Sequence, residues 1–175
     1  ACRRGGHRNG VRFGVLRSGT VAARPAGEHG RNQDTQTPDE EGAAVPHLRR
    51  ERELGRLREI AFRAVGEGSG RRRDLDSYDD DYYHLVLWDE EELEIVGAYR
   101  FIPTAEQIER KGLESIYSNS LFHYDRDMEP ILAQGIELGR SFIQPAYWGK
   151  RGLDYLWLGI GAYLSKYPQY RYLFG

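Results

Sequence analysis

An apolar hairpin pattern limits the folds open to this chain more than any other feature of its sequence. Residues 83–88 form a largely apolar run, residues 89–92 are charged, and residues 94–102 form a second largely apolar run. A continuous apolar run is typical of a buried strand, and two such runs joined by a short polar turn predict an antiparallel hairpin. The sequence therefore predicts a hairpin whose first strand is buried.

Helical periodicity flanks this hairpin. Apolar residues recur at three-to-four spacing over about residues 47–65, with Arg and Glu on the other side, which predicts an amphipathic helix that three glycines end. The same spacing over residues 153–166 predicts a second helix, which Pro168 ends. Further elements are expected as a short helix at residues 105–111 and as strands at residues 121–124, 136–143 and 170–174. This order predicts an α/β (α+β) domain with a mixed, mostly antiparallel sheet flanked by helices.

The first 46 residues differ in composition from the rest. They are rich in Gly, Arg and Ala and have no sustained apolar period. Residues 1–46 are therefore expected to be a disordered or extraneous segment, and residues 47–175 a single domain. The chain of 175 residues, 39% of them hydrophobic, is long enough for one buried core. The sole methionine is Met128, which indicates a fragment or a processed product.

Cysteine use and apolar segments bear on the cellular location. Cys2 is the only cysteine, so no internal disulfide can form and a reducing compartment is favoured. The longest strongly apolar stretch without charge, residues 155–165, is shorter than the ~20 residues that span a bilayer. The start of the chain lacks the apolar region of a signal peptide. A cytoplasmic location is expected.

Charges are unevenly placed along the chain. Residues 47–73 contain nine Arg and four Glu, whereas residues 74–94 contain ten acidic residues and no Lys or Arg. This pattern fits an internal electrostatic network or a basic face for an acidic partner. Two separately solvated faces explain it as well.

Four short motifs place arginines and carboxylates near the ends of the predicted elements. Singly, each is more typical of a structural ion pair than of a catalyst. Together and in this order they are more specific. They are R-x-x-x-F at Arg58 and Phe62, D-x-x-D at Asp76 and Asp79, Arg100 in VGAYRFIP, and E-x-x-R at Glu137 and Arg140 in IELGRSFI.

The motif set resembles the acyl-carrier-dependent branch of the GNAT superfamily over about residues 57–175. That branch includes the N-acyltransferases that make ornithine lipids and other N-acyl amino acids, and acyl-homoserine-lactone synthases share the same motifs. The segments HLVLWD, IVGAYR, ELGRSFI, YLWLGI and YLFG look closer to the ornithine-lipid and "hemolysin-like" branch. The resemblance implies a GNAT fold, which would be C-terminally truncated because family members continue past the LFG segment.

The resemblance also implies substrates and partners. The donor would be the acyl-phosphopantetheine of an acyl carrier protein, or acyl-CoA, with no permanently bound cofactor. The acceptor would be the α-amine of an amino acid, ornithine first, in lipid biosynthesis. Acyl carrier protein is the expected partner, nucleic acid is not, and peripheral contact with the inner face of the membrane is left open.

The resemblance assigns the site residues. Glu137 is the candidate base, because an amino acid's α-amine has a pKa above neutrality and must lose a proton before it attacks a thioester. The thiol leaving group needs little acid assistance, and a strand N–H without a partner would serve the oxyanion. Arg100 and Arg140 are assigned to catalysis with Glu137. The substrate cleft is assigned to Arg58, Phe62, Asp76, Asp79, Ser141 and Phe142.

The E-x-x-R spacing predicts an irregular strand. Residues three apart on a regular strand point to opposite faces, so Glu137 and Arg140 could not both reach one cleft. A β-bulge at Gly139 would bring them to the same side.

A glycine-bearing loop precedes the helix at residues 153–166. Its backbone N–H groups, with Lys150 and Arg151 between Gly149 and Gly152, are suited to the phosphate of a phosphopantetheine arm. An ordinary strand-to-helix turn is the equally weighted alternative.

Other signals support no site. His84 and Asp89 match H-x-x-x-x-D, but residues five apart on a strand face opposite ways, so the match is interpreted as chance. The remaining histidines have no metal-ligand spacing, and the tyrosines near Arg100 fit core packing better than base stacking.

Two alternatives to the N-acyltransferase stay open. A lactone synthase would need S-adenosylmethionine as acceptor and a longer acidic N-terminal segment. A non-catalytic remnant or interaction module is the second.

Overall fold

A five-stranded mixed sheet forms the centre of the protein. The computed structural model describes residues 11–17 and 40–175. Strand order follows the sequence from β1 to β5, with antiparallel pairing except between β4 and β5, which are parallel. The strands are β1 (Val11–Arg17), β2 (Tyr83–Asp89), β3 (Glu94–Pro103), β4 (Gly135–Ile143) and β5 (Tyr172–Phe174).

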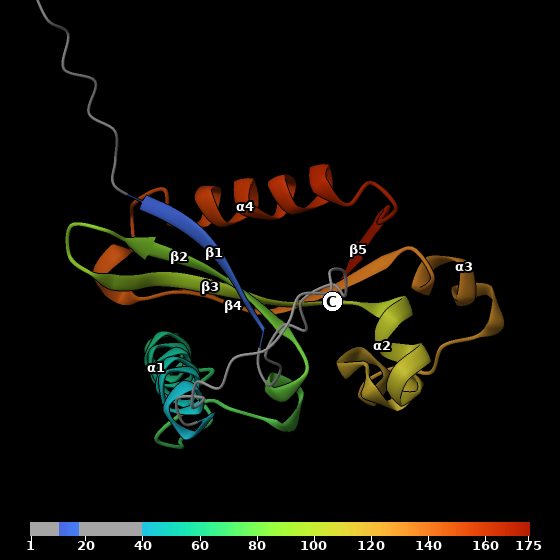
Figure 1. The fold of residues 1–175 in the computed structure, drawn as a ribbon, viewed down its shortest axis with the longest axis horizontal. Helices are drawn as coiled ribbons and strands as arrows, with labels where there is room; N and C mark the ends of the chain where they lie inside the picture. Colours follow the sequence, from blue (N-terminus) through green and yellow to red (C-terminus); the bar gives the residue numbers. More distant parts are fainter. Residues whose placement is uncertain (1–10, 18–39) are drawn as a thin grey trace, which may run out of the picture.

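Two long helices cover opposite faces of this sheet. Figure 1 shows α1 (Glu40–Ala64) on one face and α4 (Gly152–Lys166) on the other. The shorter helices α2 (Thr104–Lys111) and α3 (Glu129–Leu132) lie beside the end of the sheet where β3 ends and β4 begins. No helix of the described residues is long and apolar enough to cross a membrane.

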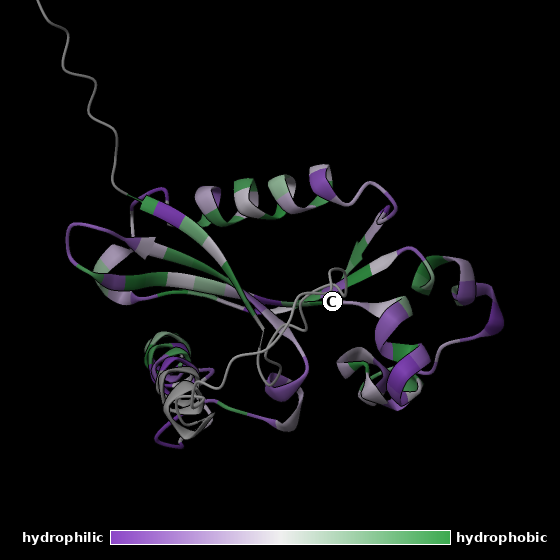
Figure 2. Cartoon of the chain, in the orientation of Figure 1, coloured by the Kyte–Doolittle hydropathy of each residue, from purple (hydrophilic) through white to green (hydrophobic). Residues whose placement is uncertain are grey.

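The β2 strand has a core on each face because its side chains alternate. Leu85 and Leu87 belong to the cluster under α4, whereas Val86 between them belongs to the cluster under α1. Figure 2 shows the apolar colouring of the strands between the two helices. This two-sided burial explains why residues 83–88 carry a nearly continuous apolar run.

Most elements expected from the sequence are confirmed. The hairpin, both long helices, the short helix after Pro103 and the strands near residues 136–143 and 170–174 are all present. The prediction of a strand at residues 121–124 is wrong. Leu121 and Phe122 both donate backbone hydrogen bonds to Ser118, so this stretch closes a turn.

The expectation for residues 1–46 is wrong in part. Residues 11–17 form β1 on the edge of β2, and α1 already includes residues 40–46. Val11, Phe13 and Val15 alternate with smaller or charged residues, a period-two signal that the Gly- and Arg-rich composition obscures. Residues 1–10 and 18–39 lie outside the described part of the chain.

The bulge expected in β4 is confirmed, one residue after Gly139. Arg100 pairs with Gly139 and Ala98 pairs with Phe142, so Arg140 and Ser141 together face a single β3 residue. Arg140 has a φ of 51°, in the left-handed region that few non-glycine residues adopt. The bulge turns Arg140 toward the α1 face of the sheet, where Glu137 also points.

Candidate functional site

Seven charged or titratable side chains gather on the α1 face of the sheet. They come from α1, from the 3₁₀ turn at Ser77–Asp80 with the residues just before it, and from β2, β3 and β4. We call them the ionic network. Its members are Arg58, Asp74, Asp76, Asp79, His84, Arg100 and Arg140.

Asp79 is the centre of the ionic network. Its carboxylate accepts two hydrogen bonds from the Arg58 guanidinium, at 3.1 and 2.7 Å, and one from Arg100 at 3.2 Å. The His84 Nε2 lies 3.2 Å from the same carboxylate, and the backbone N–H of Asp76 donates to it at 2.9 Å. Five contacts saturate the carboxylate, so Asp79 has no lone pair left for a substrate.

Both charges at this centre are stabilised despite their burial. Burial alone would raise the pKa of Asp79, but hydrogen bonds from His84 and Arg58 and the charges of Arg58 and Arg100 hold it well below its usual range. Burial opposes the charge on Arg100 as well, but Asp79 and Asp76 raise its pKa. The pair is therefore ionised at neutral pH.

The ionic network reaches the surface at Arg140. Its side chain is 31% exposed, whereas those of Arg58 and Arg100 are 2% exposed. The Arg140 guanidinium lies 3.5 Å from Asp74 and 3.7 Å from Asp76, and these are the longest ion pairs of the network. Arg140 is therefore the arginine of the network that a ligand can reach.

Formal charges in the network balance. Three arginines face three aspartates, so the network is neutral when His84 is neutral. Asp76 and Asp79 both pair with arginines of the four motifs, which is the internal electrostatic network that the uneven charge distribution allowed. Balance of this kind lets a buried ionic cluster exist beside an apolar core.

Glu137 lies next to the network in a pocket of its own. It is 2% exposed, and its carboxylate accepts the backbone N–H of Ser118 at 2.6 Å and that of Tyr117 at 3.1 Å. The Tyr82 hydroxyl donates to the same carboxylate. Burial and this bond to Glu137 raise the pKa of Tyr82. The assignment of Glu137 as base stays a prediction, but these donors occupy both of its oxygens.

Aromatic rings connect Glu137 to the arginines. The Arg100 guanidinium lies over the rings of Tyr78, Tyr82 and Tyr117, at 5.9, 5.1 and 5.6 Å from their centroids. The Arg140 guanidinium lies 5.9 Å from the centroid of the Tyr117 ring, so both arginines contact this ring. Because Glu137 fixes the Tyr117 backbone, it also fixes the ring that both arginines contact.

The other residues assigned to substrate binding have different places. Phe62 and Phe142 pack in the apolar cluster under α1, and Phe142 is buried there. Ser141 is half-buried in the β4 bulge. Arg58, Asp76 and Asp79 are members of the ionic network rather than of an open cleft.

The loop assigned to phosphate binding lies apart from the network, before α4. Gly149 has a φ of 75° and open space around it, whereas a side chain at Gly152 would contact Ile143. Lys150 lies over the Tyr147 ring, and Arg151 pairs with Asp154 at 3.3 Å. The loop exposes two cations at a helix N-terminus, and its role stays a prediction.

An apolar pocket of about 410 Å³ lies beside the ionic network on the same face of the sheet. Its walls include Val86 and Trp88, the inward-facing β2 residues that follow His84. Gly14 forms part of its floor, where an added side chain would meet no atom within 4 Å. The volume is within the range of ligand pockets.

Four residues of the site were not predicted from the sequence. Asp74 was hidden among ten acidic residues, and His84 was considered only with Asp89, which instead accepts from the Tyr147 hydroxyl. Tyr82 and Tyr117 gave no motif signal, because one acts through a hydroxyl in an aromatic run and the other through its backbone. Among residues 11–17 and 40–175, no three His, Cys, Asp or Glu side chains are grouped to hold a metal ion.

Comparison with known proteins identifies relatives. The glycine N(alpha)-acyltransferase of Bacteroides thetaiotaomicron is 40% identical over 136 residues, which cover 71% of this chain and 40% of the relative. The L-ornithine N(alpha)-acyltransferase of Agrobacterium fabrum is 32% identical over 121 residues, which cover 63% of this chain and 39% of the relative. The chain thus spans less than half the length of these relatives.

One solved structure also matches. The AHL synthase LasI has a TM-score of 0.39 and 17% identity, over 65% of this chain and 57% of LasI. That score does not establish a shared fold. The family model of the acetyltransferase (GNAT) domain, however, matches residues 57–158, which span α1 to α4 and include every member of the ionic network. The expected GNAT fold is confirmed, and the chain belongs to the family of acetyltransferase (GNAT) domains.

Proposed function

We propose that this chain transfers a fatty acyl group from a thioester to the α-amine of an amino acid. One observation carries the proposal: the relatives named N(alpha)-acyltransferase are similar over most of the chain, at 40% identity for the protein of Bacteroides thetaiotaomicron. The apolar pocket beside the ionic network supports a long-chain acyl group, since it is large and lined mainly by apolar side chains.

Glycine becomes the first acceptor to test, ahead of ornithine. The relatives named for glycine are 40% and 38% identical to this chain, whereas that of Agrobacterium fabrum, named for ornithine, is 32% identical. Both acceptors share an α-amine and an α-carboxylate. A planar guanidinium pairs well with a carboxylate through two parallel hydrogen bonds, and Arg140 is the network cation that reaches the surface.

The chemistry needs a deprotonated amine at the thioester carbon. The amine nitrogen attacks the carbonyl carbon, the C–S bond breaks, and the thiolate leaves with the electron pair of that bond. The proton lost by the amine goes to a base or to water. Glu137 is buried and accepts three hydrogen bonds, which favours transfer of the amine proton to water or to another group. Glu137 then acts by positioning the Tyr82 side chain and the backbone of Tyr117 and Ser118.

The donor is proposed to be an acyl-carrier thioester in lipid biosynthesis. The phosphopantetheine arm carries one phosphodiester, and the loop before α4 offers Lys150 and Arg151 beside backbone N–H groups. Acyl-CoA presents more phosphates to the same loop. Comparison of the two donors at matched acyl chain length tests this choice.

The test is a transfer assay on the full-length protein with acyl-carrier thioester or acyl-CoA as donor. Glycine, ornithine and S-adenosylmethionine serve as separate acceptors, and mass spectrometry identifies the N-acyl product. We expect N-acylglycine or N-acylornithine. A lactone formed from S-adenosylmethionine would support the synthase alternative. Consumption of no donor with any acceptor would support the non-catalytic alternative and refute the proposal.

A further inference from the structure

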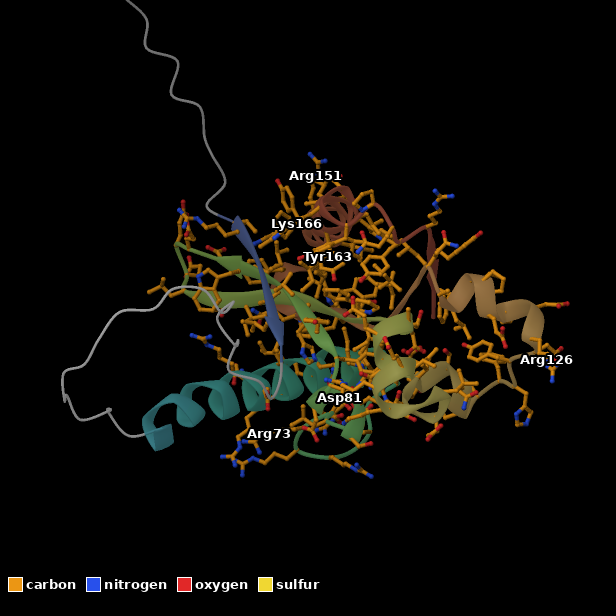
Figure 3. All side chains as sticks on the ribbon, turned by 45° about the vertical axis from the view of Figure 1, so that its right-hand side comes forward. Arg73, Asp81, Arg126, Arg151, Tyr163 and Lys166 are labelled. Carbon is orange, nitrogen blue, oxygen red and sulfur yellow. The ribbon has the colours of Figure 1, made fainter. Side chains whose placement is uncertain are left out.

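His84 lies on β2, at the edge of the ionic network, and is 4% exposed. The residue before it, Tyr83, stacks on Phe101, which contacts Tyr163 of α4. Because side chains alternate along a strand, His84 points to the opposite face, on the side of α1. Figure 3 shows these two sides, with Tyr163 pointing to the sheet from α4 and Asp81, just before β2, on the side of α1.

The apolar pocket begins next to His84. Val86 follows His84 on the same face of β2, and Leu16 of β1 pairs with His84 across the sheet. Both Val86 and Leu16 line the pocket. On the other side of His84, Arg100 is its partner in β3. His84 therefore lies between the pocket proposed for the acyl chain and the arginines of the ionic network.

Asp79 fixes which ring nitrogen of His84 carries a proton. Asp79 is ionised, and an ionised carboxylate can only accept hydrogen bonds. The Nε2 atom of His84, 3.2 Å from this carboxylate, is therefore the donor. In a neutral ring with its proton on Nε2, the free lone pair is on Nδ1. Within residues 11–17 and 40–175, the Nδ1 atom has no hydrogen-bond partner and is not sealed from solvent.

The charges around His84 suit a ring that takes up and releases a proton. The charged groups that face it are the other six members of the ionic network, from α1, the turn before β2, β3 and β4, and Leu16 of β1 adds no charge. A proton transfer from a bound ammonium group to the ring moves one positive charge and leaves the net charge of the site unchanged. The imidazolium then lies beside the ionised Asp79, which stabilises it.

We propose that His84 is the general base of the acyl transfer, oriented by Asp79 and acting through Nδ1; this inference rests on the proposed function. The Nδ1 atom takes a proton from the ammonium group of the acceptor, directly or through one water. The free amine then attacks the thioester carbonyl carbon, and the C–S bond breaks with its electron pair on sulfur. The second amine proton goes to the thiolate, and the imidazolium releases its proton to water. Asp79 keeps the ring in place and stays ionised throughout.

His84→Gln in the full-length protein tests this assignment. The glutamine amide can still donate to Asp79, but it has no basic nitrogen. With the thioester that the unchanged protein uses, kcat/KM for glycine should fall at least about 10²-fold at pH 7. The deficit should shrink by up to about tenfold per pH unit between about pH 7 and 9, because more of the glycine arrives unprotonated. A structural role alone gives a deficit that is the same at each pH.

A second variant and a matched control separate catalysis from folding. His84→Ala removes the ring, and added imidazole should raise its rate at least about tenfold by acting as the base. The control is His123→Gln, because His123 is exposed in the loop before α3. It should keep the kcat/KM of the unchanged protein, and circular dichroism with thermal unfolding checks that all three variants fold.

Nitrogen-15 NMR of the His84 ring in the full-length protein gives a result that needs no acyl transfer. We expect the proton on Nε2 and the lone pair on Nδ1, and a ring with its proton on Nδ1 would overturn the assignment.

The outcomes distinguish this assignment from the proposed function. If the unchanged protein transfers acyl groups but folded His84→Gln keeps its rate, or loses the same factor at each pH, His84 is not the base and the proposed function stands. If the unchanged protein consumes no thioester with any acceptor, the proposed function fails and the assignment of the base fails with it.

Discussion

Substitution of Glu137 by Gln separates two roles that differ in their effect on folding. If Glu137 is the base that the family resemblance implies, its loss would cost at least about 10²-fold in rate without weakening the fold. The structure instead shows a buried carboxylate that holds the backbone of Tyr117 and Ser118. We expect Glu137→Gln to weaken both the fold and the turnover.

The magnitude follows from the donors around the side chain. The glutamine oxygen can accept the Ser118 N–H, and its amide can donate to the Tyr82 oxygen after that hydroxyl rotates. The Tyr117 N–H then keeps only its 2.9 Å bond to the Tyr82 oxygen and loses the carboxylate at 3.1 Å. Loss of one hydrogen bond to a charged group costs about 1.5–3 kcal/mol.

Glu137→Ala should cost more. It leaves the Ser118 N–H without a partner and reduces that of Tyr117 to a single one, at about 1–3 kcal/mol for each buried donor left unpaired. Urea unfolding followed by circular dichroism measures both values. Glu106→Gln is the matched control, because Glu106 also accepts a tyrosine hydroxyl, from Tyr170 at 3.0 Å, but is exposed. Its change should stay within about 0.5 kcal/mol.

The pH profile of kcat/KM in the full-length protein completes the test. If Glu137 positions the site, the Gln variant keeps the acidic limb of the profile at a lower rate, because the ionising base is another group. A Gln variant with unchanged unfolding free energy and no acidic limb would refute this reasoning and restore the base.

Three further substitutions test the network, the loop after α1 and the pocket. Asp79→Asn should lower the unfolding free energy by about 3–5 kcal/mol at pH 7. Because the folded-state pKa of Asp79 is lowered, this difference should shrink by about 1.4 kcal/mol per pH unit below about pH 3.9; urea unfolding that shows no shrinkage would contradict it. Hydrogen bonds from Ser69, and then from Arg63, lower the pKa of Glu59 to about 2. The contribution of the ionised Glu59 to the free energy of unfolding is therefore fully present above about pH 4.3 and is lost as the pH falls toward 2. Ser69→Ala should flatten that acid dependence in thermal unfolding, and an unchanged slope would count against it. Gly14→Ile should fill the apolar pocket and reduce kcat/KM for long-chain donors at least about tenfold, with short-chain donors spared; equal effects on both lengths would remove the pocket from acyl binding.

The sequence by itself determined the elements and named most of the network. Period-two and period-3.6 patterns are local, so β2, β3, β4 and both long helices could be predicted within a few residues at most boundaries. Residue spacing even predicted the β4 bulge, since Glu137 and Arg140 could reach one side only through an irregular strand. Local signals failed where a strand depends on its neighbour, as in β1, or where turn bonds override a short apolar run, as at residues 121–124.

Only the tertiary structure decided what these residues contact. Arg58 and Asp79 are 21 positions apart, and their pairing depends on how α1 crosses β2 and β3. Backbone N–H groups have no residue-specific signal, so no pattern could show that Ser118 and Tyr117 occupy the Glu137 carboxylate. Contacts between distant segments are set by packing, and packing decides which carboxylate is free to react and which is held.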